Sequence, residues 1–374
     1  MEIVNGTRYL LEGQLSDDKF GRRYLLAVAK ATFKFPEDGG GDATPRLADL
    51  QQPIFSSDLF EGEPGLSTPY FEADAAYYKP RCDIVVKAAA YPPNGRAVPE
   101  LDVGFRVGEC EKWAHVVGER HWQRGFLGLA PSAPEPFLRM PITYSRAYGG
   151  TRIEKGQHRV YAANPLGCGY ATAAGGTDLA DHPVPNLEAR GAPITDPHRA
   201  HAAVSFGPIG RSWDARIGFA GTYDQHWIDE VFPLLPADFD EQYFQCVPAD
   251  QQIAHPRGGE QVLLYQMHPR RPRIAFRLPR LHLPMVVLDR DRRVHRLQPL
   301  PDTLNFDVDA ETFSVTWRVR HPIRRSLDEV HTLAAGLLCK RWWKARVTGT
   351  ADCGCGGKET DDEDLAPVTE ALDA

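Results

Sequence analysis

The chain has 374 residues, of which 42% are hydrophobic and 25% are charged, and it carries a formal net charge of −7. This composition is typical of a globular protein that is long enough to bury a sizeable core, in one large β domain or two ordinary ones. The negative charge opposes non-specific attraction to nucleic acid and to anionic membranes, so we expect neither as a partner.

The first residues, Met1 to Gly6, place an acid where a secretory signal needs basic residues, and no apolar segment follows them. The apolar run from Tyr24 to Ala29 is far below the roughly 20 residues that span a bilayer. We therefore expect a cytoplasmic protein. The seven cysteines are an odd number and are spread along the chain. They favour reduced, buried thiols over a disulfide framework.

Most of the predicted elements are short strands. From Leu25 to Phe35 apolar residues alternate with Lys30, Thr32 and Lys34, which predicts a half-buried strand. The near-continuous apolar run from Asp83 to Ala90 is typical of a buried strand. Residues 101–107 and 110–117 form a predicted hairpin, and further strands are expected at 261–266, 273–278, 285–288 and 294–297.

The clearest periodic signal lies between Leu304 and Val319, where apolar and polar residues alternate on both sides of a short turn. It predicts an antiparallel hairpin with one solvated face. Further on, Ser326 and Glu329 form a capping box that precedes apolar residues at helical spacing. We therefore predict one helix from Leu327 to about Trp343.

These elements predict a mainly β protein of antiparallel sheets, sandwich-like or barrel-like, with long ordered loops and one C-terminal helix. We divide the chain into a β-rich domain at 1–325, in one lobe or two, a helix at 326–346 and an acidic tail at 347–374. The tail is rich in Gly, Asp, Glu and Thr, and this composition predicts disorder.

The segment from Phe206 to Glu260 fits no single secondary-structure period. It holds large aromatic residues at high density among many acids, and so many aromatics argue against disorder. We interpret it as an ordered segment pinned by its aromatic side chains. It is either a surface for a partner or a chain crossing fastened onto a β scaffold, and aromatic residues are more often core than contact.

The chain has no G-x-S-x-G elbow, no P-loop, no H-E-x-x-H and no G-x-G-x-x-G between a strand and a helix. Asp238 and Asp240, on either side of Phe239, could act as an acid and base pair on a sugar, which makes a carbohydrate-active β protein the alternative function. Cys353 and Cys355 supply two thiolates, but a structural zinc site needs four ligands. We predict no catalytic residue, no cofactor and no bound metal.

Nine arginines lie between Arg270 and Arg296, and only Asp289 and Asp291 oppose them. Binding of single-stranded nucleic acid would need aromatic residues interleaved with these cations, and Phe276 alone is too few. The run indicates a charged sheet face or a docking surface for an acidic partner.

Many short motifs, in a fixed order between about residues 3 and 325, resemble the adaptor or effector-chaperone family of bacterial type VI secretion systems. The matching motifs are Lys30-Ala-Thr-Phe33, Glu61-Gly-Glu-Pro64, Tyr78-Lys-Pro80, Glu119-Arg-His-Trp122, Tyr144-Ser-Arg-Ala-Tyr-Gly-Gly150, Asn164-Pro-Leu-Gly167, Pro185-Asn-Leu-Glu188, Phe206-Gly-Pro-Ile209, Trp213-Asp-Ala-Arg216, Gly221-Thr-Tyr-Asp224, Trp227, Leu235-Pro-Ala-Asp-Phe-Asp240 and Pro248-Ala-Asp-Gln-Gln252. The chain after Ser326 lies outside the resemblance.

The resemblance implies a cytoplasmic, non-enzymatic protein that holds a toxic effector, often through a PAAR-like spike-tip domain, and promotes its loading onto the VgrG spike. Within these motifs we predict the partner-binding side chains to be Glu61, Glu63, Tyr78, Arg120, Trp122, Arg146, Tyr148, Trp213, Arg216, Tyr223, Asp224, Trp227, Asp238, Phe239, Asp240 and Gln251.

Overall fold

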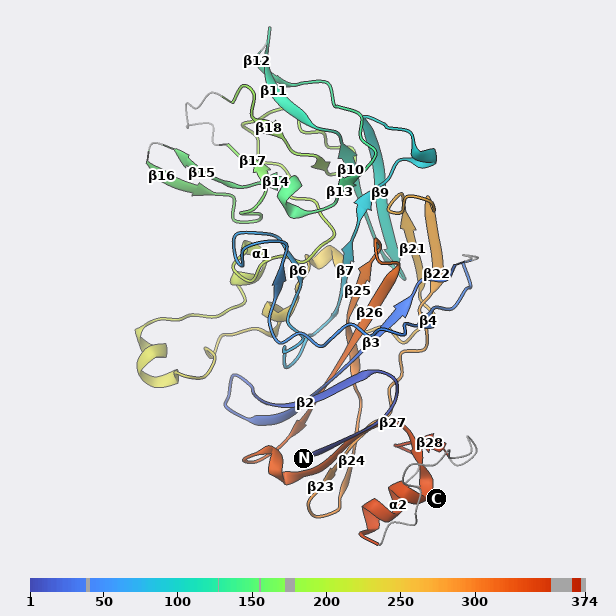
Figure 1. Cartoon of the computed structure of the whole chain (residues 1–374). Coiled ribbons are helices and arrows are strands. Elements are labelled where there is room, and N and C mark those ends of the chain that lie inside the picture. Colours follow the sequence, from blue (N-terminus) through green and yellow to red (C-terminus); the bar gives the residue numbers. More distant parts are fainter. Residues whose placement is uncertain (38–40, 127, 155, 172–178, 351–364, 371–374) are drawn as a thin grey trace.

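A computed structural model describes residues 1–37, 41–126, 128–154, 156–171, 179–350 and 365–370. Strands make up 41% of the chain and helices 10%, which confirms the predicted mainly β class. The strands form several sheets, mostly antiparallel, along an elongated molecule (Figure 1). No sheet in the described residues closes into a barrel.

The central sheet has seven strands and contains the hairpin predicted at 304–319. Its order is β2 (Leu10–Asp17), β3 (Arg23–Lys34), β26 (Thr312–Pro322), β25 (Leu300–Asp307), β7 (Cys82–Lys87) and β20 (Gln252–Ile253), and β4 (Arg46–Leu47) also pairs with β3. All neighbours are antiparallel except β25 and β7. In this register Phe33 lies opposite Phe313 and Ala29 opposite Trp317, so the apolar residues share one face.

Two five-stranded sheets lie beyond the ends of the central sheet (Figure 1). The first has the order β19 (Leu187–Glu188), β10 (Cys110–Val117), β9 (Glu100–Val107), β21 (Gln261–Tyr265) and β22 (Arg273–Arg277). The second has the order β1 (Glu2–Gly6), β27 (Val330–Cys339), β23 (Met285–Asp289) and β24 (Val294–Leu297), with β28 (Leu365–Pro367) paired to β27. The strands predicted at 101–117 and between 261 and 297 are therefore confirmed.

The remaining elements are short. They are β5 (Leu59–Phe60), β6 (Pro69–Phe71), β8 (Ala89–Ala90), β11 (Arg120–Gly125), β12 (Gly128–Pro131), β13 (Met140–Pro141), β14 (Tyr148–Gly149), β15 (Thr151–Glu154), β16 (Gln157–Val160), β17 (Cys168–Gly169), β18 (Pro183–Val184), α1 (Asp214–Ile217) and α2 (Lys340–Thr348), with 3₁₀ turns at Pro93–Gly95, Tyr144–Arg146, Glu241–Phe244, Ala249–Gln251 and Leu327–Glu329 and a π-helical turn at Trp227–Val231. No helix in the described residues has the length and apolar character needed to cross a membrane.

One continuous apolar core contains residues of all three large sheets. The ring of Phe313 illustrates it, because its centroid lies 5.2 Å from that of Phe33, 5.5 Å from that of Phe276 and 5.4 Å from that of Phe306. Such stacked pairs add to the free energy of burial. The cysteines of the described residues are all free, and four of these five are buried, as expected for reduced thiols.

The helix predicted from Leu327 to Trp343 is wrong in most of its length. The capping residues act as predicted, since the Ser326 side chain accepts a hydrogen bond from the Asp328 amide, but they begin only a 3₁₀ turn. Strand β27 follows, because it lies between β1 and β23 and both of its faces are buried. A strand buried on both faces is a nearly unbroken apolar run, which also satisfies helical spacing. The helix, α2, starts only at Lys340, and its Trp343 is fully buried.

Two described parts of the predicted tail, 347–350 and 365–370, contain regular elements. Residues up to Thr348 belong to α2, and β28 pairs with Leu337–Cys339 of β27. Ala366 and Val368 are buried against Trp343 in a small apolar cluster. Cys353 and Cys355 lie outside the described residues, so the structure does not test their metal-binding potential.

The solvated faces predicted for two strands are buried. Lys30 and Thr32 on β3, and Ser314, Thr316 and Arg318 on β26, expose at most 6% of their surface. The chain around 51–79 and 206–252 lies over this face, and its polar groups replace water. For example, Thr316 donates a hydrogen bond of 3.1 Å to Asp74. An alternating pattern is the same whether water or a polar segment covers the second face.

Candidate functional site

The predicted partner-binding residues divide by exposure. Trp122, Tyr148, Trp213, Arg216, Phe239 and Gln251 are buried; Tyr78, Arg120, Arg146, Trp227 and Asp240 are partly buried; and Glu61, Glu63, Tyr223, Asp224 and Asp238 are exposed. A buried side chain cannot contact a partner without opening the fold. The first group is therefore part of the scaffold in this structure, and the partner contacts of all these residues stay a prediction.

The buried aromatic residues fill two parts of the core. Trp213 packs edge-on against Tyr144, with ring centroids 5.0 Å apart, and belongs to the main core. Trp122 and Tyr148 lie in a separate cluster near β11 and β14. Phe239 exposes only 2% of its surface. These aromatic residues pack in the core. For Trp213 and Phe239 this agrees with the alternative in which the segment is a chain crossing fastened onto a β scaffold.

Two of the predicted arginines stabilise loops. The guanidinium of Arg120 lies 2.7 Å from the carboxylate of Glu188 and also donates to the Pro185 carbonyl. Arg146 lies 2.6 Å from Glu119, and donates to the side-chain oxygen of Asn186 at 2.9 Å. Both therefore tie the 119–188 region together, which accounts for their presence without a partner.

Tyr78 has a similar structural contact. The Arg320 guanidinium lies over its ring, 5.1 Å from the centroid, and also over the rings of Tyr77 and Tyr24. Cation–π contacts of this kind hold side chains together at a partly desolvated surface. Gln251 is fully buried and donates to the carbonyls of Ile84 and Phe206. It thereby fastens the segment from Phe206 to Glu260, which we call the aromatic segment, to β7.

A group of buried charges lies under the aromatic segment, and the sequence analysis missed it. We call it the buried ionic cluster; it comprises Lys30, Glu72, Asp74, Lys79, Asp83, Arg216, Asp302 and Arg318. Lys30 lies 2.8 Å from Asp74, and Lys79 lies 2.7 Å from Asp83. Opposite charges and extra hydrogen bonds offset the cost of burying each ion.

Arg216 joins the aromatic segment to this cluster. Its guanidinium lies 2.5 Å from Glu72 and donates to the carbonyls of Ile209 and Tyr243. Arg211 adds a second link, because it lies 3.1 Å from Glu72, and it also binds both oxygens of Asp58 at 2.8 and 2.9 Å. The positions of residues 209–243 are therefore fixed by charged hydrogen bonds as well as by packing.

Burial and the neighbouring charges act in opposite directions on these groups. Burial alone would raise the pKa of Glu72, but the cations of Arg216, Lys79 and Arg211 lower it from 4.5 to about 2. Burial would lower the pKa of Lys79, yet Asp83, Cys246 and Glu72 raise it above its usual value. Both groups are therefore charged at neutral pH.

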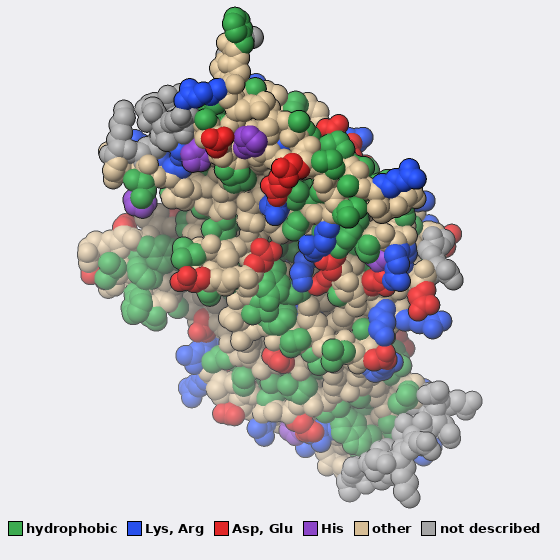
Figure 2. Space-filling view, turned by 45° about the horizontal axis from the view of Figure 1, so that its top comes forward, with side chains coloured by type: hydrophobic (Ala, Val, Ile, Leu, Met, Phe, Trp, Pro, Cys, Tyr) green, Lys and Arg blue, Asp and Glu red, His purple; other side chains and the backbone are tan. Residues whose placement is uncertain are grey.

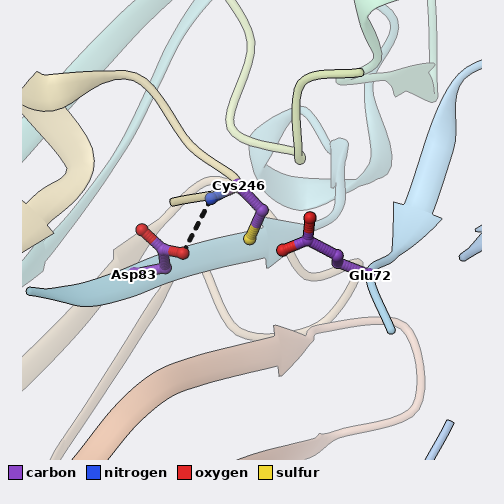
Figure 3. A group of neighbouring side chains, drawn as sticks. All are labelled: Glu72, Asp83 and Cys246. Carbon is purple, nitrogen blue, oxygen red and sulfur yellow. Dashed lines mark hydrogen bonds between the residues drawn. The ribbon is translucent and has the colours of Figure 1, made fainter. Parts of the chain in front are cut away.

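Glu72, Asp83 and Cys246 form a set of three groups that could in principle hold a metal, since their ligand atoms lie within 4.8 Å of one another. Figure 3 shows these side chains close together, with the Cys246 amide donating to Asp83. The Lys79 ammonium is 2.7 Å from Asp83, 3.3 Å from Glu72 and 3.7 Å from the Cys246 sulfur. The Lys79 ammonium thus supplies the positive charge between these three groups. The set therefore does not fit a metal ion in addition to the ammonium.

The exposed part of the aromatic segment has a different character. We call residues 222–235 the aromatic lobe; it includes the π-helical turn Trp227–Val231 and protrudes from the body of the molecule (Figure 1). Tyr223 is 50% exposed, Ile228 56% and Phe232 66%. Figure 2 shows apolar side chains gathered on a lobe at the left of the molecule, where Figure 1 places this segment.

Ring contacts and hydrogen bonds hold the aromatic lobe in shape. The ring of Trp227 lies edge-on to Tyr223, with centroids 4.7 Å apart, and edge-on to Phe232 at 5.6 Å. Its indole nitrogen donates to the Leu234 carbonyl at 2.9 Å, and its amide donates to Asp224. Trp227 is therefore the internal support of the lobe, while Tyr223 and Phe232 face outward.

The carboxylates proposed for sugar chemistry have structural roles. Asp238 accepts hydrogen bonds from the amide and the hydroxyl of Thr222, at 3.0 and 2.7 Å, and so closes the base of the aromatic lobe. These bonds lower the pKa of Asp238. Asp240 caps the 3₁₀ turn Glu241–Phe244 through the Gln242 amide. The described residues therefore give the carbohydrate alternative no geometric support.

Glu61 and Glu63 lie on the exposed turn between β5 and β6. Residues next to them line a cavity of about 200 Å³, together with Glu72 and Arg216 of the buried ionic cluster. Phe60, Leu166, Ile209 and Trp213 are among its lining residues. The arginines between Arg270 and Arg296 do not form one face, because β22 and β23–β24 belong to different sheets. Several bind within the chain, as Arg277 does to Asp42 at 2.8 Å.

The exposed large apolar residues of the lobe that were not predicted as contacts are Ile228 and Phe232. Phe232 was among the aromatics of the segment, but residue type alone does not separate it from the buried Phe239. The buried ionic cluster had a sequence signal, since Asp83 begins a strand that is otherwise apolar and Arg318 interrupts the 312–322 strand. Buried charges at such places need partners.

Comparison with known proteins identifies one family. Residues 20–318 match the family model described as an uncharacterized protein conserved in bacteria (DUF2169). No curated protein and no solved structure matches the chain. The matched range includes the buried ionic cluster, the aromatic lobe and the central sheet except β2 and the end of β26, and it ends before β27.

Proposed function

The chain belongs to the bacterial family DUF2169, and from this premise we propose that it is a non-enzymatic adaptor that binds an effector of a type VI secretion system. In this proposal the adaptor holds the effector through a PAAR-like spike-tip domain and promotes its loading onto the VgrG spike. The short motifs between residues 30 and 252, which follow one another in a fixed order, support the proposal through their resemblance to such adaptors.

The observation that carries the proposal is the exposed aromatic lobe. Monomeric proteins seldom leave several large apolar side chains together on a protruding segment unless they bind something. Tyrosine and other aromatic residues dominate the free energy of binding at protein interfaces. The rest of the segment is fixed to the body, so the lobe is presented in a defined orientation.

The test is capture of a named partner. The chain is co-expressed with the effector encoded beside its gene, and the amount of effector retained in a pull-down and its solubility are measured. The adaptor function predicts a stable complex and more soluble effector than without the chain.

Two results would overturn this function. One is that the unaltered protein binds no effector or spike-tip protein encoded in its gene neighbourhood. The other is hydrolysis of a glycoside that is lost in Asp238→Asn or Asp240→Asn, which would establish the carbohydrate-active alternative. A pull-down of unrelated proteins from a lysate does not count as support.

A further inference from the structure

The charge of the aromatic lobe indicates what kind of surface it contacts. Between Thr222 and Asp240 the sequence contains five acidic residues and no lysine or arginine. The acids are Asp224, Asp229, Glu230, Asp238 and Asp240, and all except Asp240 are exposed. Exposed apolar side chains and exposed carboxylates thus occur together in the lobe and at its base.

These carboxylates bind neutral groups of the lobe. Asp224 accepts from the Trp227 amide, Asp229 from the Gln225 side chain at 2.9 Å, and Asp238 from Thr222. Such bonds orient the carboxylates but leave their charge in place. The negative potential around Tyr223 and Phe232 is therefore available to a partner.

The base of the lobe is held by a neighbouring turn. The Lys19 ammonium donates to the Phe239 carbonyl at 2.6 Å. Gly21 lies close to Leu234, since a Cβ atom added to this glycine would be 3.2 Å from the leucine side chain. Together with Asp238 and Thr222, these contacts make the lobe a fixed feature of the surface. A fixed aromatic tip binds with a smaller loss of conformational entropy than a flexible loop.

We propose that the aromatic lobe docks into an apolar hollow bordered by lysine and arginine side chains on the surface of the bound effector. This proposal rests on the adaptor function and specifies the chemistry of the partner. Phe232 and Tyr223 would enter the hollow, and the exposed carboxylates of the lobe and its base would lie against the lysine and arginine side chains at its border. Complementary charges of this kind raise the association rate and select the partner.

A first experiment does not depend on any effector. Random peptides displayed on phage are selected on the intact protein, with counter-selection on the Tyr223→Ala, Phe232→Ala double variant. We expect the enriched peptides to carry large apolar residues flanked by Lys or Arg. Enrichment of acidic or uncharged peptides, or equal binding to the variant, would overturn the proposed partner chemistry.

A second experiment measures the affinity of the purified chain for the neighbouring effector. Phe232→Ala should weaken binding by about 30-fold or more, as expected for an interface anchor. The Asp229→Asn, Glu230→Gln double variant should weaken it about three- to tenfold at low salt, mainly through the association rate. This difference should vanish near 0.5 M salt, where charges are screened over a few ångströms.

The Glu109→Gln, Asp291→Asn double variant is the matched control, because it removes two exposed acids from other turns. It should leave the affinity unchanged within about twofold, since it keeps the lobe charges. Equal weakening by both double variants would overturn the assignment to the lobe. So would an effector that binds all three variants as tightly as it binds the unaltered chain, and in that case the adaptor function would stand.

The occupant could instead be a second copy of this chain. Light scattering of the unaltered protein and of Phe232→Ala decides this outcome. A dimer that the substitution dissociates would overturn the effector-binding proposal. Absence of effector binding combined with cationic apolar peptides from the display experiment would overturn the adaptor function and leave the chemistry of the lobe standing.

Discussion

The two parts of the aromatic segment place charges and rings in opposite ways. Around Arg216, charged side chains are buried against the central sheet and aromatic rings pack beside them. In the aromatic lobe, Tyr223 and Phe232 are exposed, and so are the acids Asp224, Asp229 and Glu230. The difference teaches that the segment is fastened by ionic hydrogen bonds. Its apolar side chains are not all needed to hold it, and some remain free to contact a partner.

The largest expected effect lies in the buried part. Lys79→Ala leaves the carboxylates of Asp83 and Glu72 without their shared ammonium, and this should lower the free energy of unfolding by about 3–5 kcal/mol. Urea unfolding followed by tryptophan fluorescence measures it. Lys34 is the control, since its ion pair with Asp49 is exposed and Lys34→Ala should leave the unfolding midpoint unchanged. Similar midpoints for both variants would contradict a stabilising role of the buried ionic cluster.

The same substitution at two phenylalanines separates the two parts of the segment. Phe239→Ala should cost about 3–5 kcal/mol because it leaves a cavity in the core. Phe232→Ala should change the free energy of unfolding by less than about 1 kcal/mol, because its ring is mostly exposed. Both are measured by thermal unfolding. A large loss of stability in Phe232→Ala would show that the lobe is scaffold and not surface.

A pH titration sharpens the comparison for Glu72. Its pKa is lowered from 4.5 to about 2 in the folded state, so its charge stabilises the fold fully above pH 4.5. This contribution, about 3 kcal/mol, disappears as the pH falls from 4.5 towards 2. The gap in unfolding free energy between the unaltered protein and Glu72→Gln should therefore narrow over this range. A gap that stays constant from pH 6 to pH 3 would contradict the ionic role.

The smallest effect is expected at the base of the aromatic lobe. Asp238→Ala removes the bonds to Thr222, and we expect faster proteolysis and amide exchange within residues 222–235. The melting temperature should move by no more than about 2 °C, because the core is untouched. Limited proteolysis with mass spectrometry locates the cleavage sites. Protection equal to that of the unaltered lobe would mean that Trp227 alone maintains its shape.

The sequence predicted the hairpins at 101–117 and 304–319, because alternation with period two is a local property of a strand. It did not predict β27, since a strand covered on both faces loses that alternation. Neither did it predict that Arg318 is buried, because the segment covering it is far away in the chain. The buried state of a polar residue depends on such distant contacts.

The same limit applies to the candidate site. Trp213 and Tyr223 both lie in motifs of the segment and are chemically similar, yet one is buried and the other is half exposed. The many aromatic residues predicted an ordered segment from Phe206 to Glu260, and the structure describes all of these residues. Which rings face solvent depends on how the buried ionic cluster and the turn at Lys19 position the chain.

Strand β1 can pair with β27 only after β27 has been synthesised, more than 300 residues further along the chain. Glu2 pairs with Thr332 and Gly6 with Gly336, in a parallel register. Ribosomes add roughly 5–20 residues per second, so the first strand waits on the order of tens of seconds for its neighbour. A messenger RNA truncated before the codon for Gly336 would leave the end of β1 unpaired. Quality-control proteases would then find the defect in β1, although the missing codons encode part of β27.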